Sequence, residues 1–215
     1  MRRIIVIVFV MLLLAAGAYA DVFGNALQQR SYVDQCDGCV FAYLPVPAGD
    51  VGQTLDDWSY YADQNSVVGN LITPILFLSL GSNNFQVAAI GATQHNAGPG
   101  VQHYLFGLQP GGNAVLQAGE YLGWVDGTPA GATNSGTISF DGTAEGAWWY
   151  NSYPGIGSIA VGNNITLMPS TVLGTVSFED RTYSINGSTV PEPTSILLFG
   201  ICLVGVGNRL RRRVR

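Results

Sequence analysis

Glycine divides the central part of this chain into short pieces, and no stretch of it sustains the periodicity of an amphipathic helix. Of the 28 glycines, 24 lie between Asp21 and Thr189. The segments between them are short and rich in β-formers, and Gly, Asn, Asp and Pro bound them. The sequence therefore predicts an all-β domain of about a dozen short strands.

The predicted strands show the two-residue alternation of a half-buried sheet in places. Leu122 and Trp124 share one face of a strand, and Ile138 and Phe140 share one face of another. The predicted strands are Val40–Val46, Thr54–Ala62, Ile75–Leu80, Phe85–Ala92, His103–Leu108, Ala114–Gln117, Tyr121–Val125, Thr137–Phe140, Ala147–Asn151, Ile165–Met168, Gly174–Phe178 and Thr182–Ile185.

Short strands separated by frequent turns favour two antiparallel sheets packed face to face, as a β-sandwich or a jelly-roll-like single domain. A propeller would repeat every ~40–50 residues, and the sequence shows no such repeat. We expect Ser188–Pro191 to begin an extended linker beyond the last strand.

The N-terminus has the pattern of a secretory signal peptide. Arg2 and Arg3 precede an apolar stretch over Ile4–Ala16, and Ala18-Tyr19-Ala20 supplies a small-x-small cleavage site. We predict cleavage after Ala20, by general secretion rather than a twin-arginine route. The apolar stretch is short for a permanent membrane span.

The C-terminus combines three features in a fixed order. Val190-Pro191-Glu192-Pro193 is followed by an apolar run over Thr194–Gly207 and then by five arginines, the last of which is Arg215. A helix over those 14 apolar residues would cover ~21 Å, which is short of the ~30 Å hydrocarbon core. Such a transmembrane helix suits a transient anchor, and the basic cluster would keep its end cytoplasmic.

In these three features residues 190–215 resemble the PEP-CTERM sorting class of exported bacterial proteins. The resemblance implies that the tail is recognised by a membrane-embedded exosortase after transient inner-membrane anchoring. It also implies delivery to the cell envelope, the cell surface or an extracellular, exopolysaccharide-rich matrix. An ordinary C-terminal membrane anchor with a chance Pro-x-Pro is the alternative.

The sequence thus divides into a signal peptide (1–20), a secreted domain (21–189) and a sorting tail (190–215). The domain contains 13 acidic residues but only Arg30 and Arg181 as bases, so its formal charge is −11. A surface this anionic repels phosphate backbones, which argues against a nucleic-acid partner.

Cys36 and Cys39 are the two cysteines of the domain, since Cys202 lies in the tail. In an oxidising compartment we expect them to form a disulfide around a tight turn. A redox motif would open a helix instead of preceding a strand, and a zinc site would need ligands beyond the distant His95 and His103.

The candidate ligand surface consists of Trp124, Asp126, Trp149 and Asn151. Aromatic faces pack on sugar rings, and carboxylate or amide groups bond sugar hydroxyls, so this set predicts a carbohydrate partner. Core packing of the aromatic residues is the alternative, and the stronger one.

Enzymatic activity is the second functional hypothesis, although we expect none. A glycoside hydrolase would need two of Glu120, Asp126, Asp141 and Glu145 to face one bond. Turn chemistry already explains Asp126-Gly127 and Asp141-Gly142. No calcium ladder or nucleophile elbow is present in the sequence, so we expect no cofactor, with calcium as the alternative.

Overall fold

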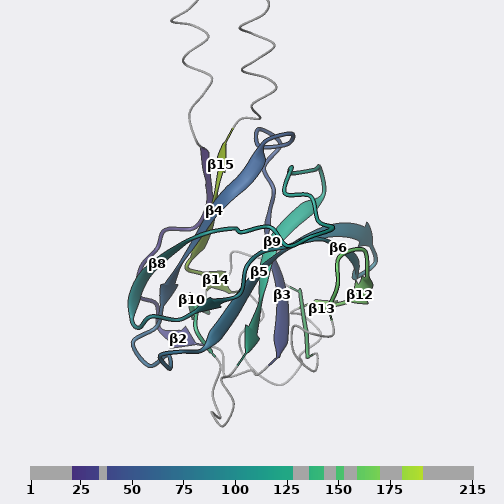
Figure 1. Cartoon of the computed structure of the whole chain (residues 1–215). Coiled ribbons are helices and arrows are strands. Elements are labelled where there is room, and N and C mark those ends of the chain that lie inside the picture. Colours follow the sequence, from purple (N-terminus) through teal and green to yellow (C-terminus); the bar gives the residue numbers. More distant parts are fainter. Residues whose placement is uncertain are drawn as a thin grey trace, which may run out of the picture.

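The computed structural model describes residues 21–33, 38–127, 136–142, 149–152, 159–169 and 181–190. Every regular element in these ranges is a β-strand, and every strand pair is antiparallel (Figure 1). The all-β, antiparallel prediction is therefore confirmed. The predicted signal peptide and sorting helix lie outside the described residues, and within those residues no helix could cross a membrane.

The first sheet has the strand order β1-β15-β4-β8. Its members are β1 (Asp21–Gly24), β15 (Ile185–Val190), β4 (Thr54–Ala62) and β8 (Gly100–Leu105). Strands from the two ends of the domain are thus neighbours, and Figure 1 shows the purple β1 beside the yellow-green β15.

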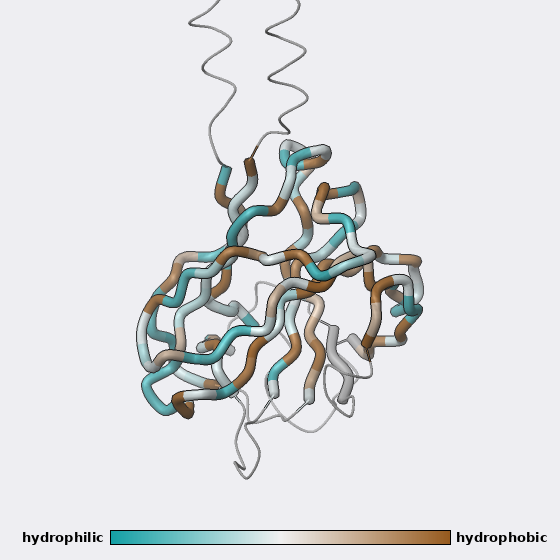
Figure 2. Tube along the Cα trace, viewed as in Figure 1, coloured by the Kyte–Doolittle hydropathy of each residue, from teal (hydrophilic) through white to brown (hydrophobic). Residues whose placement is uncertain are grey.

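The largest sheet has the order β12-β6-β5-β9-β3-β11-β13, with β7 paired to β5. Hydrophobic segments recur along β3 and β5 in the middle of the molecule (Figure 2). The bounds are β3 Cys39–Pro45, β5 Leu71–Gly81, β6 Asn84–Ile90, β7 Gln94–His95, β9 Glu120–Gly127, β11 Trp149–Ser152, β12 Asn164–Thr166 and β13 Met168–Pro169.

A third, small sheet has the order β14-β10-β2. It consists of β2 (Tyr32–Val33), β10 (Ser139–Asp141) and β14 (Thr182–Tyr183). Its strands are only two or three residues long, so side-chain packing rather than its ladder must hold it in place.

A hydrophobic core joins the first sheet to one face of the largest sheet, which is the face-to-face packing of a β-sandwich. Leu55, Trp58 and Tyr60 of β4 share a cluster with Phe41 of β3 and Trp124 of β9. The aromatic rings are in direct contact: the centroids of Phe41 and Trp124 are 4.8 Å apart and those of Trp58 and Tyr60 are 5.2 Å apart.

The largest sheet is also covered on its opposite face. Val40, Ile75 and Phe77 form a second cluster with Ile159 and Ile165 from the segment around β12. Strand β3 is accordingly buried from Cys39 to Leu44 without alternation, as expected for a strand that is covered on both faces.

The structure corrects two features of the predicted domain boundary. Asp21–Gly24 forms β1, although no strand is predicted there, and Ser188–Val190 completes β15 instead of beginning a linker. The predicted Ala114–Gln117 strand is reduced to a single bridge between Val115 and Thr54. The predicted Gly174–Phe178 strand lies outside the described residues.

Candidate functional site: the terminal strands and the sorting motif

The two ends of the folded domain meet at one position on the first sheet. In the backbone register Asp21 lies opposite Thr189, and Phe23 lies opposite Gly187. Because the strands are antiparallel, the chain before Asp21 and the chain after Val190 leave from the same end of the sheet.

Small residues let β1 pack closely on β15. Phe23 is 6% exposed and lies over Gly187, where an added Cβ would come within 2.8 Å of the phenyl ring. Gly24 ends β1 with a φ of +119°, and a Cβ there would meet the Ile185 carbonyl oxygen at 2.7 Å. The sequence of this strand pair therefore favours a tight junction.

A series of side-chain hydrogen bonds, from Thr189 through Gln53 to Asp50, holds Thr189 in place. Its side chain is fully buried, and its hydroxyl donates a hydrogen bond of 2.8 Å to Gln53 Oε1. Gln53 Nε2 donates to Asp50 Oδ1 at 3.3 Å and to the Gly49 carbonyl oxygen at 3.0 Å.

Asp50 is the last residue in this series of hydrogen bonds. Asp50 is 2% exposed, so its carboxyl group is buried at the end of this set of hydrogen bonds. Burial raises the pKa of Asp50, and the neighbouring Asp21 raises it further through its charge and a hydrogen bond.

The comparison with known families locates the sorting signal relative to this junction. Residues 189–213 match the PEP-CTERM protein-sorting motif. The matched segment thus starts at Thr189, a buried residue of β15, and no linker separates it from the folded domain. A motif of this class marks the chain as an exported protein of the exosortase-targeted type. No curated protein and no solved structure matches the chain.

Within the Val-Pro-Glu-Pro segment, the structure describes Val190. Val190 is the last residue of β15 and lies opposite Thr54. Pro191, Glu192 and Pro193 follow it directly and lie outside the described residues.

The structure places Trp124 and Asp126 in the core, which corrects the ligand-surface prediction for these two residues. Trp124 is 0% exposed and Asp126 is 1% exposed. The indole Nε1–H of Trp124 donates a 3.2 Å hydrogen bond to Asp126 Oδ2. The core-packing alternative from the sequence applies here, and neither side chain can contact a ligand at the surface.

For Trp149 and Asn151 the structure describes the backbone only. They lie in β11, opposite Ala42 and Val40 of β3. Trp124 lies opposite Phe41, whose partner in β11 is Tyr150. Trp124 and Trp149 therefore belong to adjacent sets of paired residues across the three strands. A ligand role for Trp149 and Asn151 stays a prediction.

The structure describes one of the two cysteines of the predicted disulfide. Cys39 begins β3, is fully buried and is disulfide-bonded. Cys36 lies outside the described residues, so its pairing with Cys39 stays a prediction.

The paired-carboxylate arrangement of a glycoside hydrolase is not formed by Glu120 and Asp126. Both side chains are 1% exposed and stand at opposite ends of β9. Six residues of a strand span ~20 Å, whereas the two carboxyl groups of a glycosidase lie ~5–10 Å apart. Glu120 instead accepts a 2.8 Å hydrogen bond from the Gln117 backbone N–H, and burial raises its pKa.

Asp141 has a structural partner, and Glu145 lies outside the described residues. Arg30 Nη1 lies 3.0 Å from Asp141 Oδ2, and the Ser31 backbone N–H donates to Asp141 Oδ1 at 2.9 Å. Burial acts to raise the pKa of Asp141, but the bonds from Ser31 and Arg30 outweigh it and lower the pKa. This carboxylate holds β10 against the segment before β2.

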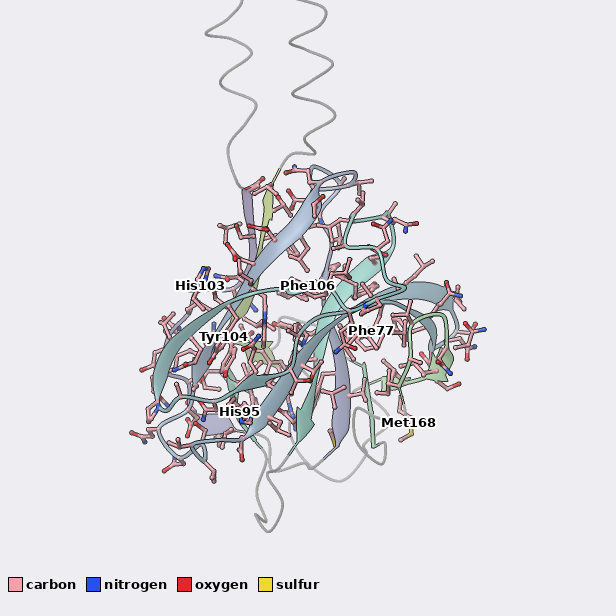
Figure 3. The ribbon with its side chains drawn as sticks, in the orientation of Figure 1. Phe77, His95, His103, Tyr104, Phe106 and Met168 are labelled. Carbon is pink, nitrogen blue, oxygen red and sulfur yellow. The ribbon has the colours of Figure 1, made fainter. Side chains whose placement is uncertain are left out.

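Sequence reasoning missed one cluster that the strand register assembles. Ser59 of β4 lies opposite His103 of β8, and Ser59 Oγ is 2.7 Å from His103 Nδ1. His103 Nε2 is 3.7 Å from Asp57 Oδ2, which is longer than a hydrogen bond. Figure 3 shows His103 on the outer part of this sheet.

This cluster lacks the geometry of a hydrolytic triad. Ser59 is only 6% exposed, and the long aspartate contact does not orient the imidazole. Within the described ranges no three His, Cys, Asp or Glu side chains are placed to hold a metal ion. Calcium binding stays a prediction.

Proposed function

We propose that this protein is an exported, non-enzymatic envelope or matrix protein whose C-terminal tail is recognised and removed by an exosortase. The observation that carries the proposal is the match of residues 189–213 to the PEP-CTERM protein-sorting motif, which begins in the last strand of the folded domain. The tail delivers a pre-formed β-domain, and the domain ends where the signal begins.

The rest of the domain supports a structural role outside the cytosol. Its formal charge of −11 is distributed over a glycine-rich body without lysine, and such a surface favours solubility and disfavours binding to polyanions. Of the carboxylates that a hydrolase would use, Glu120 and Asp126 are buried and Asp141 is paired with Arg30. Glu145 lies outside the described residues. Within this role, a carbohydrate partner would have to depend on residues other than Trp124 and Asp126.

The test of export and sorting uses the full chain, expressed in a bacterium with an exosortase and in the same strain without it. We expect a shorter, membrane-released form only when the enzyme is present. Replacing Pro191 and Pro193 by alanine in one variant should retain the longer, membrane-bound form. Pro110→Ala, which changes an exposed proline away from the motif, is the control and should be processed normally. Equal processing of both variants would contradict the proposal.

The glycan role is tested on the released protein with a panel of polysaccharides. A structural component is expected to show no retention, and Trp149→Ala should change nothing. Retention that Trp149→Ala abolishes would instead establish a carbohydrate-binding function, and turnover of the polysaccharide would establish a hydrolase.

A further inference from the structure

A threonine hydroxyl and a glutamine amide meet where β15 ends beside the start of β4. Thr189 Oγ1 lies 2.8 Å from Gln53 Oε1, although the two residues are 136 positions apart in the sequence. Because a C=O bond is about 1.2 Å long, Oγ1 is within about 4 Å of the amide carbon Cδ of Gln53. A hydroxyl and a carboxamide in contact are the two groups from which an ester can form.

The Gln53 amide is held in one orientation. Its nitrogen Nε2 donates hydrogen bonds to the Gly49 carbonyl oxygen at 3.0 Å and to Asp50 Oδ1 at 3.3 Å. Since an amide nitrogen only donates, these two acceptors direct Oε1 and Cδ toward Thr189. The register of β15 on β4 shifts between Ser188 and Thr189, and a shift of this kind re-aims a side chain. Both groups are therefore positioned by the fold.

Asp50 supplies an acid beside the amide nitrogen. It is 2% exposed, and its carboxyl group contacts the nitrogen that would leave as the ester forms. Burial raises the pKa of this carboxyl group, so that a larger fraction of it is protonated at neutral pH than for an exposed aspartate. A protonated carboxyl group can donate its proton to the amide nitrogen, which otherwise leaves poorly.

We propose that Thr189 and Gln53 condense to an intramolecular ester that joins the end of β15 to the start of β4. The bond between Thr189 Oγ1 and Gln53 Cδ forms, and the bond between Cδ and Nε2 breaks. Asp50 donates a proton to Nε2 and takes up the hydroxyl proton of Thr189 in return. Ammonia leaves, Asp50 ends in the protonation state in which it began, and no oxidant or reductant is required.

Contact and burial favour this reaction over the hydrolysis that would reverse its effect. Two well-oriented groups in contact react as if each were present at about 10⁵–10⁸ M. The terminal torsion of a glutamine is soft, so a rotation of the amide can turn the face of Cδ toward Oγ1. Thr189 is fully buried, which keeps water from the ester, and the released ammonia diffuses away.

A second hydroxyl–amide pair lacks this protection. Thr166 Oγ1 lies 3.0 Å from Asn84 Oδ1, and both residues are exposed. Water would hydrolyse an ester at that position, so we expect none to persist there. The pair provides a matched comparison for the buried one.

The ester would fasten the folded domain at the residue where its sorting motif begins. Residues 189–213 match that motif, so a force applied to the tail would reach the link before it reached the rest of β15. The inference does not depend on the proposed export, because both reacting residues belong to the folded domain. Its failure would leave the test of tail processing unaffected.

The experiment is a tryptic digest of the full-length chain at neutral pH after denaturation and reduction. Trypsin cuts after Arg30 and Arg181, which places Gln53 and Thr189 in different fragments. We expect the natural chain to yield these two fragments joined, with their combined mass lowered by one ammonia molecule. Hydroxylamine, which cleaves esters, should then separate them. Fragments that are separate before hydroxylamine is added would overturn the inference.

Variants locate the link. Thr189→Val removes the hydroxyl and should yield separate fragments, whereas Thr189→Ser keeps a hydroxyl and should yield joined ones. Thr166→Val removes the exposed hydroxyl and is the matched control, which should also yield joined fragments. A Thr189→Val chain whose fragments stay joined would place the link elsewhere and overturn the inference.

The role of Asp50 is measured by the rate at which the joined form appears after a pulse of synthesis. Asp50→Asn should slow this rate by at least about 100-fold, because a general acid is lost. An unchanged rate in Asp50→Asn would contradict the proton transfer assigned to Asp50.

Discussion

Individual polar residues in this domain are held by partners that lie far away in the sequence. Arg30 and Asp141 are 111 positions apart and form an ion pair whose arginine side chain is 8% exposed. Ser184 Oγ lies 2.6 Å from the Nε of the same arginine. At the scale of the residue, this ion pair joins two segments that lie far apart in the sequence.

Replacing Asp141 by asparagine should reduce the free energy of unfolding at pH 7 by about 1–2 kcal/mol, because a charge-assisted pair is lost. The pKa of Asp141 is lowered in the folded protein. Its contribution is therefore complete above the ordinary value of about 4 and disappears as pH falls through the lowered pKa. Denaturant titrations of the exported protein and the variant at pH 7 and at about pH 2 would measure this difference. If Asp141→Asn lowered the free energy of unfolding by the same amount at about pH 2 as at pH 7, the stabilising role of the ionised Asp141 would be contradicted.

Residue-scale prediction from the sequence failed where burial decided the role. Trp124 and Asp126 are a plausible sugar-binding pair in the sequence, yet they are two residues apart on one strand and share its core-facing side. Alternation alone places both on one face without telling which face is covered. The Ser59–His103 contact could not be predicted either, since it depends on the register of β4 against β8.

At the scale of the element, close backbone approach is the main constraint. Gly123 lies in β9 opposite Ala42 of β3, next to a shift in the register of these two strands. A Cβ at this position would overlap the Phe41 carbonyl oxygen. The strands can adopt this spacing because residue 123 has no side chain.

Gly123→Ala should therefore destabilise the domain severely, by more than about 3 kcal/mol, or prevent folding. Gly127→Ala in the same strand is the control, since a Cβ there would meet its nearest neighbour, Leu71 Cβ, at 3.5 Å. We expect the free energy of unfolding of this control to lie within about 1 kcal/mol of that of the natural protein. Thermal unfolding of the exported chains provides the measurement. Similar melting temperatures for the two variants would be inconsistent with the strand spacing.

Elements were predictable where their side chains alternate or form long apolar runs. Thr54–Ala62 was predicted with the bounds that the structure gives to β4, and β3 and β9 differ from their predicted strands by only a residue or two at each end. β1 has only four residues, and its stability depends on β15, which is separated from it by most of the domain. Such a pairing leaves no local signal in the sequence.

At the scale of the whole molecule, the sheet order brings the first and last strands of the domain together. The predicted signal peptide precedes β1 and the sorting motif begins in β15, and these two strands are neighbours in the first sheet. Family comparison identified the tail, whereas the buried position of Thr189 became visible only in the structure. The sequence predicts a linker from Ser188 to Pro191, whereas the structure places Ser188–Val190 in β15.

The junction predicts that residues between the strand and the motif affect processing. Inserting a Gly-Ser spacer between Val190 and Pro191 moves the Pro-Glu-Pro segment away from β15 and makes it more accessible. We expect faster tail removal by the exosortase, measured by pulse-chase. The same spacer inserted at the exposed turn residue Gly111 should leave the rate unchanged. Slower removal after insertion at Val190 would show that the enzyme requires the strand itself.

The intact mass of the protein recovered from the surface of exosortase-bearing cells tests the central claim most directly. The account predicts a chain that starts at Asp21 and ends before the arginine cluster, with the β15 segment retained. A recovered chain that still ends at Arg215 would contradict it.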